Sequence, residues 1–234
     1  MKKLNYCWML PPVTLIVLIF ILITQANAQQ WISFDGLTTS AKEPEFEVNE
    51  SSLSGVSFDV TVPGMSVREV EHDGVTYQRL AIPEYLWTAQ VGSPEVPVVR
   101  FLVAIPECED IILEATTPDS TSRENFKVYP VPELIDDESP DGFLKERFTL
   151  NVEAYAASTY FPGKKAGVLE TGYIRDQRIA QVAVYPVQFH PAGDRLIIYS
   201  NFEIDISFTS PSGVLLKNVG PFEKICKSNI INYE

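Results

Sequence analysis

Residues 173–208 read YIRDQRIAQVAVYPVQFHPAGDRLIIYSNFEIDISF, and this stretch carries the clearest strand pattern in the chain. Its last part alternates apolar and polar residues, and the apolar ones are Phe202, Ile204, Ile206 and Phe208. A period of two places one face of a strand on a core and the other face in solvent. Residues 191–194 (PAGD) predict a turn, and residues 175–176 predict a bend. We therefore expect a long strand pair around a tight turn.

The same pattern continues toward the N-terminus. Residues 56–62 alternate apolar and polar side chains, and Asp73-Gly74 is a strong hairpin signal between apolar runs. Residues 98–105 are nearly all apolar, which is typical of a strand that is buried on both faces. Shorter strands are expected at residues 46–48, 67–70, 75–82, 111–115 and 126–129. A short helix is expected at residues 221–231.

These elements predict an all-β protein, an antiparallel, jelly-roll-like β-sandwich with a short C-terminal helical linker. We expect one domain over residues 29–215 and the linker over residues 216–234, because no low-complexity segment divides the chain. The 17 prolines suit strand edges and connections. Residues 130–142 are acidic and flanked by proline, which predicts a long loop within the domain.

The first 28 residues have the pattern of a signal peptide. Two lysines precede an apolar run at residues 13–23, and Ala26-Asn27-Ala28 predicts cleavage between Ala28 and Gln29. We expect a secreted protein in the periplasm, at the cell surface or outside the cell, with no membrane segment after cleavage. Cleavage changes the net charge from −13 to −15, because the segment holds two lysines and no acidic residue. That charge argues against nucleic acid and anionic membranes as partners.

The chain lacks the sequence motifs of common catalytic sites. HExxH, CxxC, GxSxG and P-loop patterns do not occur, and His72 and His190 each lie at a predicted turn. Cys108 and Cys226 form a disulfide or remain two separate thiols. The acidic residues 107–110 and 136–138 offer oxygen ligands but lack the spacing of a calcium loop, which favours solvated turns. We therefore expect no catalytic residue, no metal site and no cofactor.

Seven blocks occur in a specific order and spacing. They are Gly92-Ser93-Pro94-Glu95-Val96-Pro97, Val128-Tyr129-Pro130, YAASTYFPG at 155–163, YIRDQR at 173–178, VYPVQFHP at 184–191, the strand at 196–199 and FEKICKSNIINYE at 222–234. Together the blocks resemble the propeptide of the gingipain-type (family C25) cysteine endopeptidases. The resemblance covers most of the chain after residue 28.

The resemblance implies a secreted β-sandwich propeptide. Such a propeptide assists the folding of a C25-type cysteine endopeptidase and holds it latent by placing a loop in the active-site cleft. The implied partner is the peptidase catalytic domain, in cis or in trans, and residues 216–234 would lead toward that domain. The chain itself is not expected to be an enzyme, because His72 is followed by Asp73 and His190 by Pro191 instead of the glycine of the clan.

The alternative interpretation is a cell-surface β-sandwich module that binds glycan or protein. Its basis is a set of aromatic residues suited to a sugar platform, namely Trp31, Trp87, Tyr160 and Phe161. Most aromatic residues of a β-rich chain are core residues, which is the simpler explanation for them.

The resemblance also identifies a candidate inhibitory loop. In gingipains of arginine specificity, a basic residue from the loop after the VYP-like strand occupies the specificity pocket. Here residues 131–139 contain no basic residue, and the nearest are Lys145 and Arg147. The candidate residues are Leu134, Ile135, Asp136 and Asp137. Our hypothesis is that Asp136 or Asp137 fills a pocket lined by positive charge, and the alternative is a solvated acidic loop.

Overall fold

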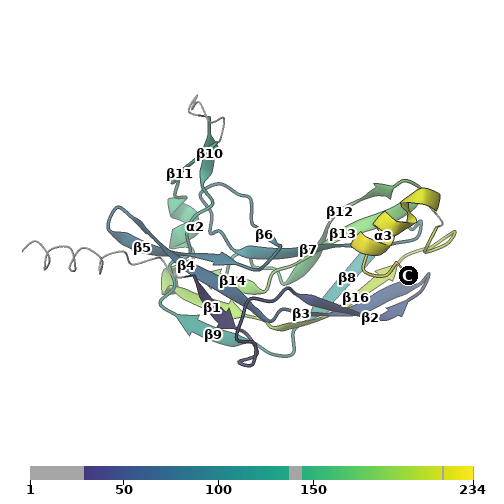
Figure 1. Cartoon of the computed structure of the whole chain (residues 1–234), viewed down its shortest axis with the longest axis horizontal. Helices are drawn as coiled ribbons and strands as arrows, with labels where there is room; N and C mark the ends of the chain where they lie inside the picture. Colours follow the sequence, from purple (N-terminus) through teal and green to yellow (C-terminus); the bar gives the residue numbers. More distant parts are fainter. Residues whose placement is uncertain (1–28, 137–143, 218, 234) are drawn as a thin grey trace, which may run out of the picture.

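The computed structural model describes residues 29–136, 144–217 and 219–233, which fold into antiparallel β-sheets and two short α-helices (Figure 1). One sheet contains, in spatial order, β2 (Glu45–Ser51), β3 (Gly55–Thr61), β16 (Asn201–Phe208) and β8 (Ile111–Thr116). The sheet that packs against it contains β12 (Ala166–Ile174), β13 (Gln177–Val184), β7 (Pro97–Ala104) and β6 (Leu86–Trp87). The fold class predicted from the sequence is confirmed.

The core lies between these two sheets. Phe101 of β7 packs against Phe46 of β2 and Phe58 of β3, with ring centroids 4.9 and 5.3 Å apart. The alternating residues of β3 and β16 point into this core as predicted, and Phe58, Phe202 and their apolar neighbours are buried. Burial of these side chains supplies the main favourable free energy of folding.

Smaller elements complete the fold. A three-stranded sheet contains β1 (Gln30–Ser33), β4 (Gly64–His72) and β5 (Val75–Ala81), with the predicted Asp73-Gly74 turn between β4 and β5. A second contains β14 (Val187–His190), β15 (Arg195–Ile198) and β9 (Thr121–Glu124). The remaining strands are β10 (Glu133–Ile135) and β11 (Lys145–Arg147), and the helices are α2 (Val152–Ala156) and α3 (Glu223–Asn229). None of the helices in the described residues is long and apolar enough to cross a membrane.

The prediction of one long strand pair over residues 173–208 is wrong. Instead the stretch takes part in two hairpins: β14 pairs with β15 around the short 3-10 helix Pro191–Gly193, and β12 pairs with β13 across the predicted bend at residues 175–176. Strand β13 also pairs with β7, and β16 pairs with β3 and β8. Pro186 explains the break, because it has no amide hydrogen to continue the ladder of β13. The stretch therefore crosses between sheets.

Two other local predictions are also wrong. Residues 133–135, placed in a long loop by the sequence, form β10, and residues 126–129 contain one isolated bridge, between Val128 and Gln78, instead of a strand. The sequence also gave no signal for β9, whose four side chains are all exposed, or for the five-residue helix α2. Pairing with β15 decides the conformation of β9, because strand formation depends strongly on the neighbouring strand.

The prediction that residues 98–105 are buried on both faces is confirmed for β7. Val99, Phe101 and Val103 face the main core. On the opposite face, Ala104 packs with Cys226 and Ile230, which belong to the segment that the sequence assigns to a linker. Helix α3 therefore packs against the end of β7, and Figure 1 shows it at the end of the sandwich where β12 and β13 also lie.

The exposed face of the sheet around β3 carries a row of carboxylates. Asp59 lies directly opposite Glu47 on one side and Glu203 on the other. Like charges at directly opposed positions destabilise a sheet. This arrangement leads to a prediction on stability.

We expect Asp59→Asn to stabilise the protein by about 0.5–1 kcal/mol, because it removes two unfavourable cross-strand contacts. Urea unfolding at low salt and at about 0.5 M NaCl measures the gain, which should shrink at high salt because exposed charges are screened. Glu71→Gln is the matched control, since Glu71 is an exposed strand carboxylate opposite Thr76. Equal gains in the two variants would contradict the cross-strand explanation.

Candidate functional site

A hairpin projects from the body of the protein. Strands β10 and β11 pair with each other and extend away from the sandwich (Figure 1). We call residues 133–136 and 144–147 the arm. Leu134 is 60% exposed and Leu144 is 56% exposed, so the arm presents apolar side chains to solvent. Because the arm projects, these side chains are accessible to another molecule.

The arm contains the candidate residues that the structure describes. Leu134 and Ile135 lie in β10, and Asp136 follows directly and is exposed, whereas Asp137 lies outside the described residues. The basic residues also belong to the arm, because Lys145 lies opposite Ile135 and Arg147 lies opposite Glu133. The Arg147 guanidinium is 2.5 Å from the Glu133 carboxylate, so that charge is neutralised across the hairpin.

The first strand of the arm rises from the block 92–97. The Gly92 amide donates to the Val131 carbonyl and the Val131 amide donates to the Ser93 carbonyl, both at 2.9 Å. Gly92 has a φ of +80°, and a Cβ there would lie 3.0 Å from the Asn151 amide nitrogen. Glycine is required at this turn for both reasons. Residues 92–97 therefore support the base of the arm, and we call them the pedestal.

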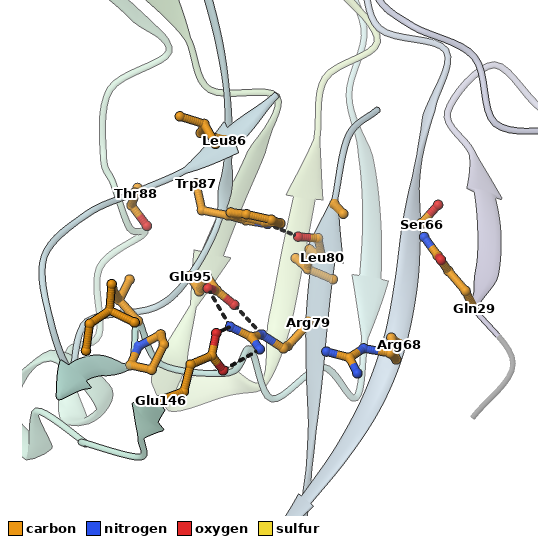
Figure 2. Close-up of a pocket in the computed structure, with 14 residues that line it drawn as sticks. Gln29, Ser66, Arg68, Arg79, Leu80, Leu86, Trp87, Thr88, Glu95 and Glu146 are labelled. Carbon is orange, nitrogen blue, oxygen red and sulfur yellow. Dashed lines mark hydrogen bonds and ion pairs between the residues drawn. The ribbon is translucent and has the colours of Figure 1, made fainter. Parts of the chain in front are cut away.

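The second strand of the arm is held by an arginine of β5. The Arg79 guanidinium donates to Glu95 at 2.8 and 3.0 Å and to Glu146 of β11 at 2.8 and 3.1 Å (Figure 2). We call these three residues the Arg79 clamp. The Glu95 side chain is 6% exposed, the Arg79 side chain 20% and the Glu146 side chain 46%. Hydrogen bonds to Glu95 in particular, and then to Glu146, raise the pKa of Arg79 above its usual value.

An aromatic cluster supports the chain just after β11. The Phe148 ring stacks on His72 with centroids 3.7 Å apart and also contacts Tyr77 and Tyr129 at 5.4 and 5.5 Å. The Arg79 guanidinium lies 4.7 Å from the centroid of the Tyr129 ring. Burial raises the pKa of Tyr129. Both ends of the arm are thus fixed on a rigid body.

A pocket of about 450 Å³ lies beside the clamp. Its apolar walls come from β6 and from the start of the arm, and Figure 2 shows Trp87 on one side and the clamp at its base. The Trp87 indole donates a hydrogen bond to the Leu80 carbonyl, which fixes the ring, while Leu86 next to it is 61% exposed. Arm and pocket form one continuous surface, because Leu134 belongs to both.

The other polar residues considered in the sequence have structural contacts. Cys108 and Cys226 are free thiols, and burial raises the pKa of Cys226. Cys108 lies 3.5 Å from the Arg178 guanidinium, and the His190 ring nitrogen Nε2 lies 3.0 Å from the Ser158 carbonyl. No group of three or more His, Cys, Asp or Glu side chains suited to a metal ion occurs in residues 29–136, 144–217 and 219–233.

Sequence reasoning did not identify Arg79, Glu146 or Phe148. A usable signal was Glu95, which is the one charged residue in a block that leads into a buried strand. A buried carboxylate requires a cation, so Glu95 pointed to an arginine or lysine partner elsewhere in the chain.

Comparisons with known proteins agree on one family. The family model Propeptide_C25 matches residues 38–234. Lys-gingipain of Porphyromonas gingivalis is 31% identical over 150 residues, or 62% of this chain and 8% of the relative. Gingipain R2 of the same organism is 25% identical over 192 residues, or 79% of this chain and 25% of the relative. The chain thus spans a small part of the length of these relatives.

Two solved structures are similar in fold. One is the complex of Porphyromonas gingivalis RgpB pro- and mature domains, with a TM-score of 0.70, 21% identity and coverage of 82% of this chain and 100% of that chain. The other concerns the zymogenic latency of gingipain K from Porphyromonas gingivalis, with a TM-score of 0.62, 25% identity and coverage of 77% and 98%.

Proposed function

The chain belongs to the Propeptide_C25 family, and from this membership we propose that it holds a C25-type cysteine endopeptidase latent and assists its folding. It is a propeptide domain and not itself the catalytic domain, which is a separate mature domain in the similar RgpB complex. We place the propeptide sandwich at residues 29–215, with residues 216–234 leading toward the catalytic domain. Cleavage between Ala28 and Gln29 would follow export, so the propeptide would act in the periplasm, at the cell surface or outside the cell.

The observation that carries the proposal is a projecting arm whose two ends are firmly attached to the sandwich. An inhibitor needs an element that enters the active-site cleft and a body that does not yield when the element docks. Three features attach the arm to the sandwich: the pedestal at residues 92–97, the Arg79 clamp and the aromatic cluster around Phe148. Pre-organisation lowers the conformational entropy that is lost on binding. The arm is therefore our candidate for the element in the cleft.

The glycan-binding alternative has less support from the aromatic residues. The Trp31 indole donates to the Thr38 carbonyl and the Trp87 indole donates to the Leu80 carbonyl. Phe161 packs against the main core. The indole N–H groups of Trp31 and Trp87 are therefore already hydrogen-bonded within the protein, and Phe161 contributes to packing. A binding assay with a C25 catalytic domain, compared with glycans, discriminates the two functions.

The test of the arm uses opposite charges on the same hairpin. If Asp136 or Asp137 fills the specificity pocket, Asp136→Ala/Asp137→Ala should raise the inhibition constant against the cognate C25 peptidase about 30-fold, as expected for an interface hot spot of about 2 kcal/mol. Lys145→Ala is the matched control, because Lys145 lies on the same arm opposite Ile135.

The outcomes of that assay assign the residue. A rise confined to the aspartate variant supports our hypothesis. A rise confined to Lys145→Ala overturns it and assigns the pocket to the basic residue of β11. Unchanged inhibition in both variants overturns the proposal that the arm enters the cleft.

A further inference from the structure

We propose that the Arg79 clamp is the positioning device of the arm: it sets the angle at which the arm leaves the sandwich and thereby sets inhibitory potency. The second half of this inference rests on the proposed function, whereas the first half concerns the protein alone. Arg79 and Glu95 belong to the body, and Glu146 belongs to the arm, so the clamp joins the two parts directly.

The contacts within and around the arm differ in what they restrain. The pair of Glu133 and Arg147 lies across the hairpin, so it keeps β10 and β11 together but does not tether them to the body. The backbone bonds at Val131 fix the point where the first strand begins. The bonds from Arg79 reach Glu146, opposite Leu134, and restrain the hairpin beyond its root.

The geometry of the clamp suits it to orient the arm. Arg79 is bound to Glu95 through Nε and Nη2 and to Glu146 through Nη1 and Nη2. A planar guanidinium with two bidentate partners fixes directions as well as distances. Because Glu95 is buried, the guanidinium has a fixed position from which it holds Glu146. Arg68 lies directly opposite Arg79 across β4 and β5, so a second cation borders the same pocket.

The partly exposed position of Glu146 makes positioning separable from stability. An ion pair in contact with water contributes little to the free energy of unfolding. A small displacement of a docking element, by contrast, lowers activity strongly, because reacting or binding groups must lie within a narrow range. Loss of the Glu146 carboxylate should therefore leave the fold intact and release the arm.

The first measurement concerns the arm alone. Spin labels are attached in a Cys108→Ser background at Leu144→Cys on the arm and Thr116→Cys on β8, both exposed positions. Pulsed electron paramagnetic resonance should give a narrow distance distribution for the parent protein, a broad one for Glu146→Ala and an intermediate one for Glu146→Gln, which keeps one acceptor oxygen. Thermal midpoints should agree within about 2 °C.

Glu124→Ala is the matched control. Glu124 is an exposed strand carboxylate on β9 that lies 3.9 Å from Arg195, so the variant makes the same change in net charge away from the arm. Its distance distribution should equal that of the parent. An unchanged distribution in Glu146→Ala overturns the inference.

The second measurement is inhibition of the cognate C25 peptidase by the same Glu146 and Glu124 variants without the cysteine substitutions and spin labels, so that Leu144 stays in place. Glu146→Ala should raise the inhibition constant about 10-fold, mainly through faster dissociation, Glu146→Gln less, and Glu124→Ala not at all. A broad distribution in Glu146→Ala with unchanged inhibition overturns the link to potency and also the proposed role of the arm. The two measurements therefore distinguish a failed clamp from a failed function.

Discussion

Replacing Arg79 by alanine is expected to destabilise the protein by about 3–5 kcal/mol, because the variant leaves a buried carboxylate without its cation. The Glu95 side chain is 6% exposed and receives two hydrogen bonds from Arg79. Urea unfolding at pH 7, followed by tryptophan fluorescence, measures the loss.

A double variant tests whether the unpaired Glu95 carboxylate is the cause. The double variant Arg79→Met/Glu95→Met removes both partners, and it should recover most of the lost stability because apolar residues replace a buried ion pair at little cost. Equal instability of the single and double variants would show that Arg79 acts through packing instead.

The sequence predicts those parts of the fold that depend on local pattern. Alternation of apolar and polar residues predicts which face of β3 and of β16 is buried, and the structure agrees. The Asp73-Gly74 turn likewise predicts the hairpin of β4 and β5. The long strand pair failed because one proline interrupts the ladder, and β9 was missed because its exposed polar side chains carry no apolar signal. Partners distant in the chain decide such elements.

The candidate site divides in the same way. The resemblance to the family predicted an inhibitory loop at residues 131–139, and the structure places residues 133–135 of that stretch in strand β10 of the arm. The sequence did not locate the anchors, because Arg79 and Glu146 are 67 residues apart in the chain and meet only when the hairpin returns beside β5. It also placed Lys145 away from the candidate loop, whereas strand pairing brings Lys145 opposite Ile135. The site therefore forms only when the chain folds, because its residues are distant from one another in the sequence.

The C-terminal segment makes contacts along β7 that resemble those of an added strand. Strand β6 covers only the start of β7, at Pro97 and Val98, and leaves the edge beyond it open. Ile230 forms a parallel bridge with Leu102, and the Ile231 amide donates to the Leu102 carbonyl at 3.0 Å. The open edge is thus closed by residues that the sequence assigns to a linker.

Asn232 completes this edge with its side chain. It is 3% exposed, its carboxamide oxygen accepts from the Ala104 amide at 2.7 Å, and its Nδ2 donates to the Ala104 carbonyl at 3.1 Å and to Ser51 at 3.3 Å. One amide side chain therefore satisfies both backbone groups of Ala104, as a neighbouring strand would. Buried backbone groups that lose their partners are costly.

We expect Asn232→Ala to destabilise the protein by about 2–4 kcal/mol, because both backbone groups of Ala104 lose their partner. Urea unfolding measures the loss, and amide hydrogen exchange at Ala104 should accelerate. Asn229→Ala is the matched control, because the exposed Asn229 side chain bonds only within its own helix, to the Ile225 carbonyl, and should cost well under about 1 kcal/mol. If the two variants were equally stable, the segment would rest on β7 without supporting it, and residues 219–233 would behave as the linker that the sequence predicts. A large difference would instead make this segment part of the sandwich, so that any chain continuing past it would be held at the edge of β7.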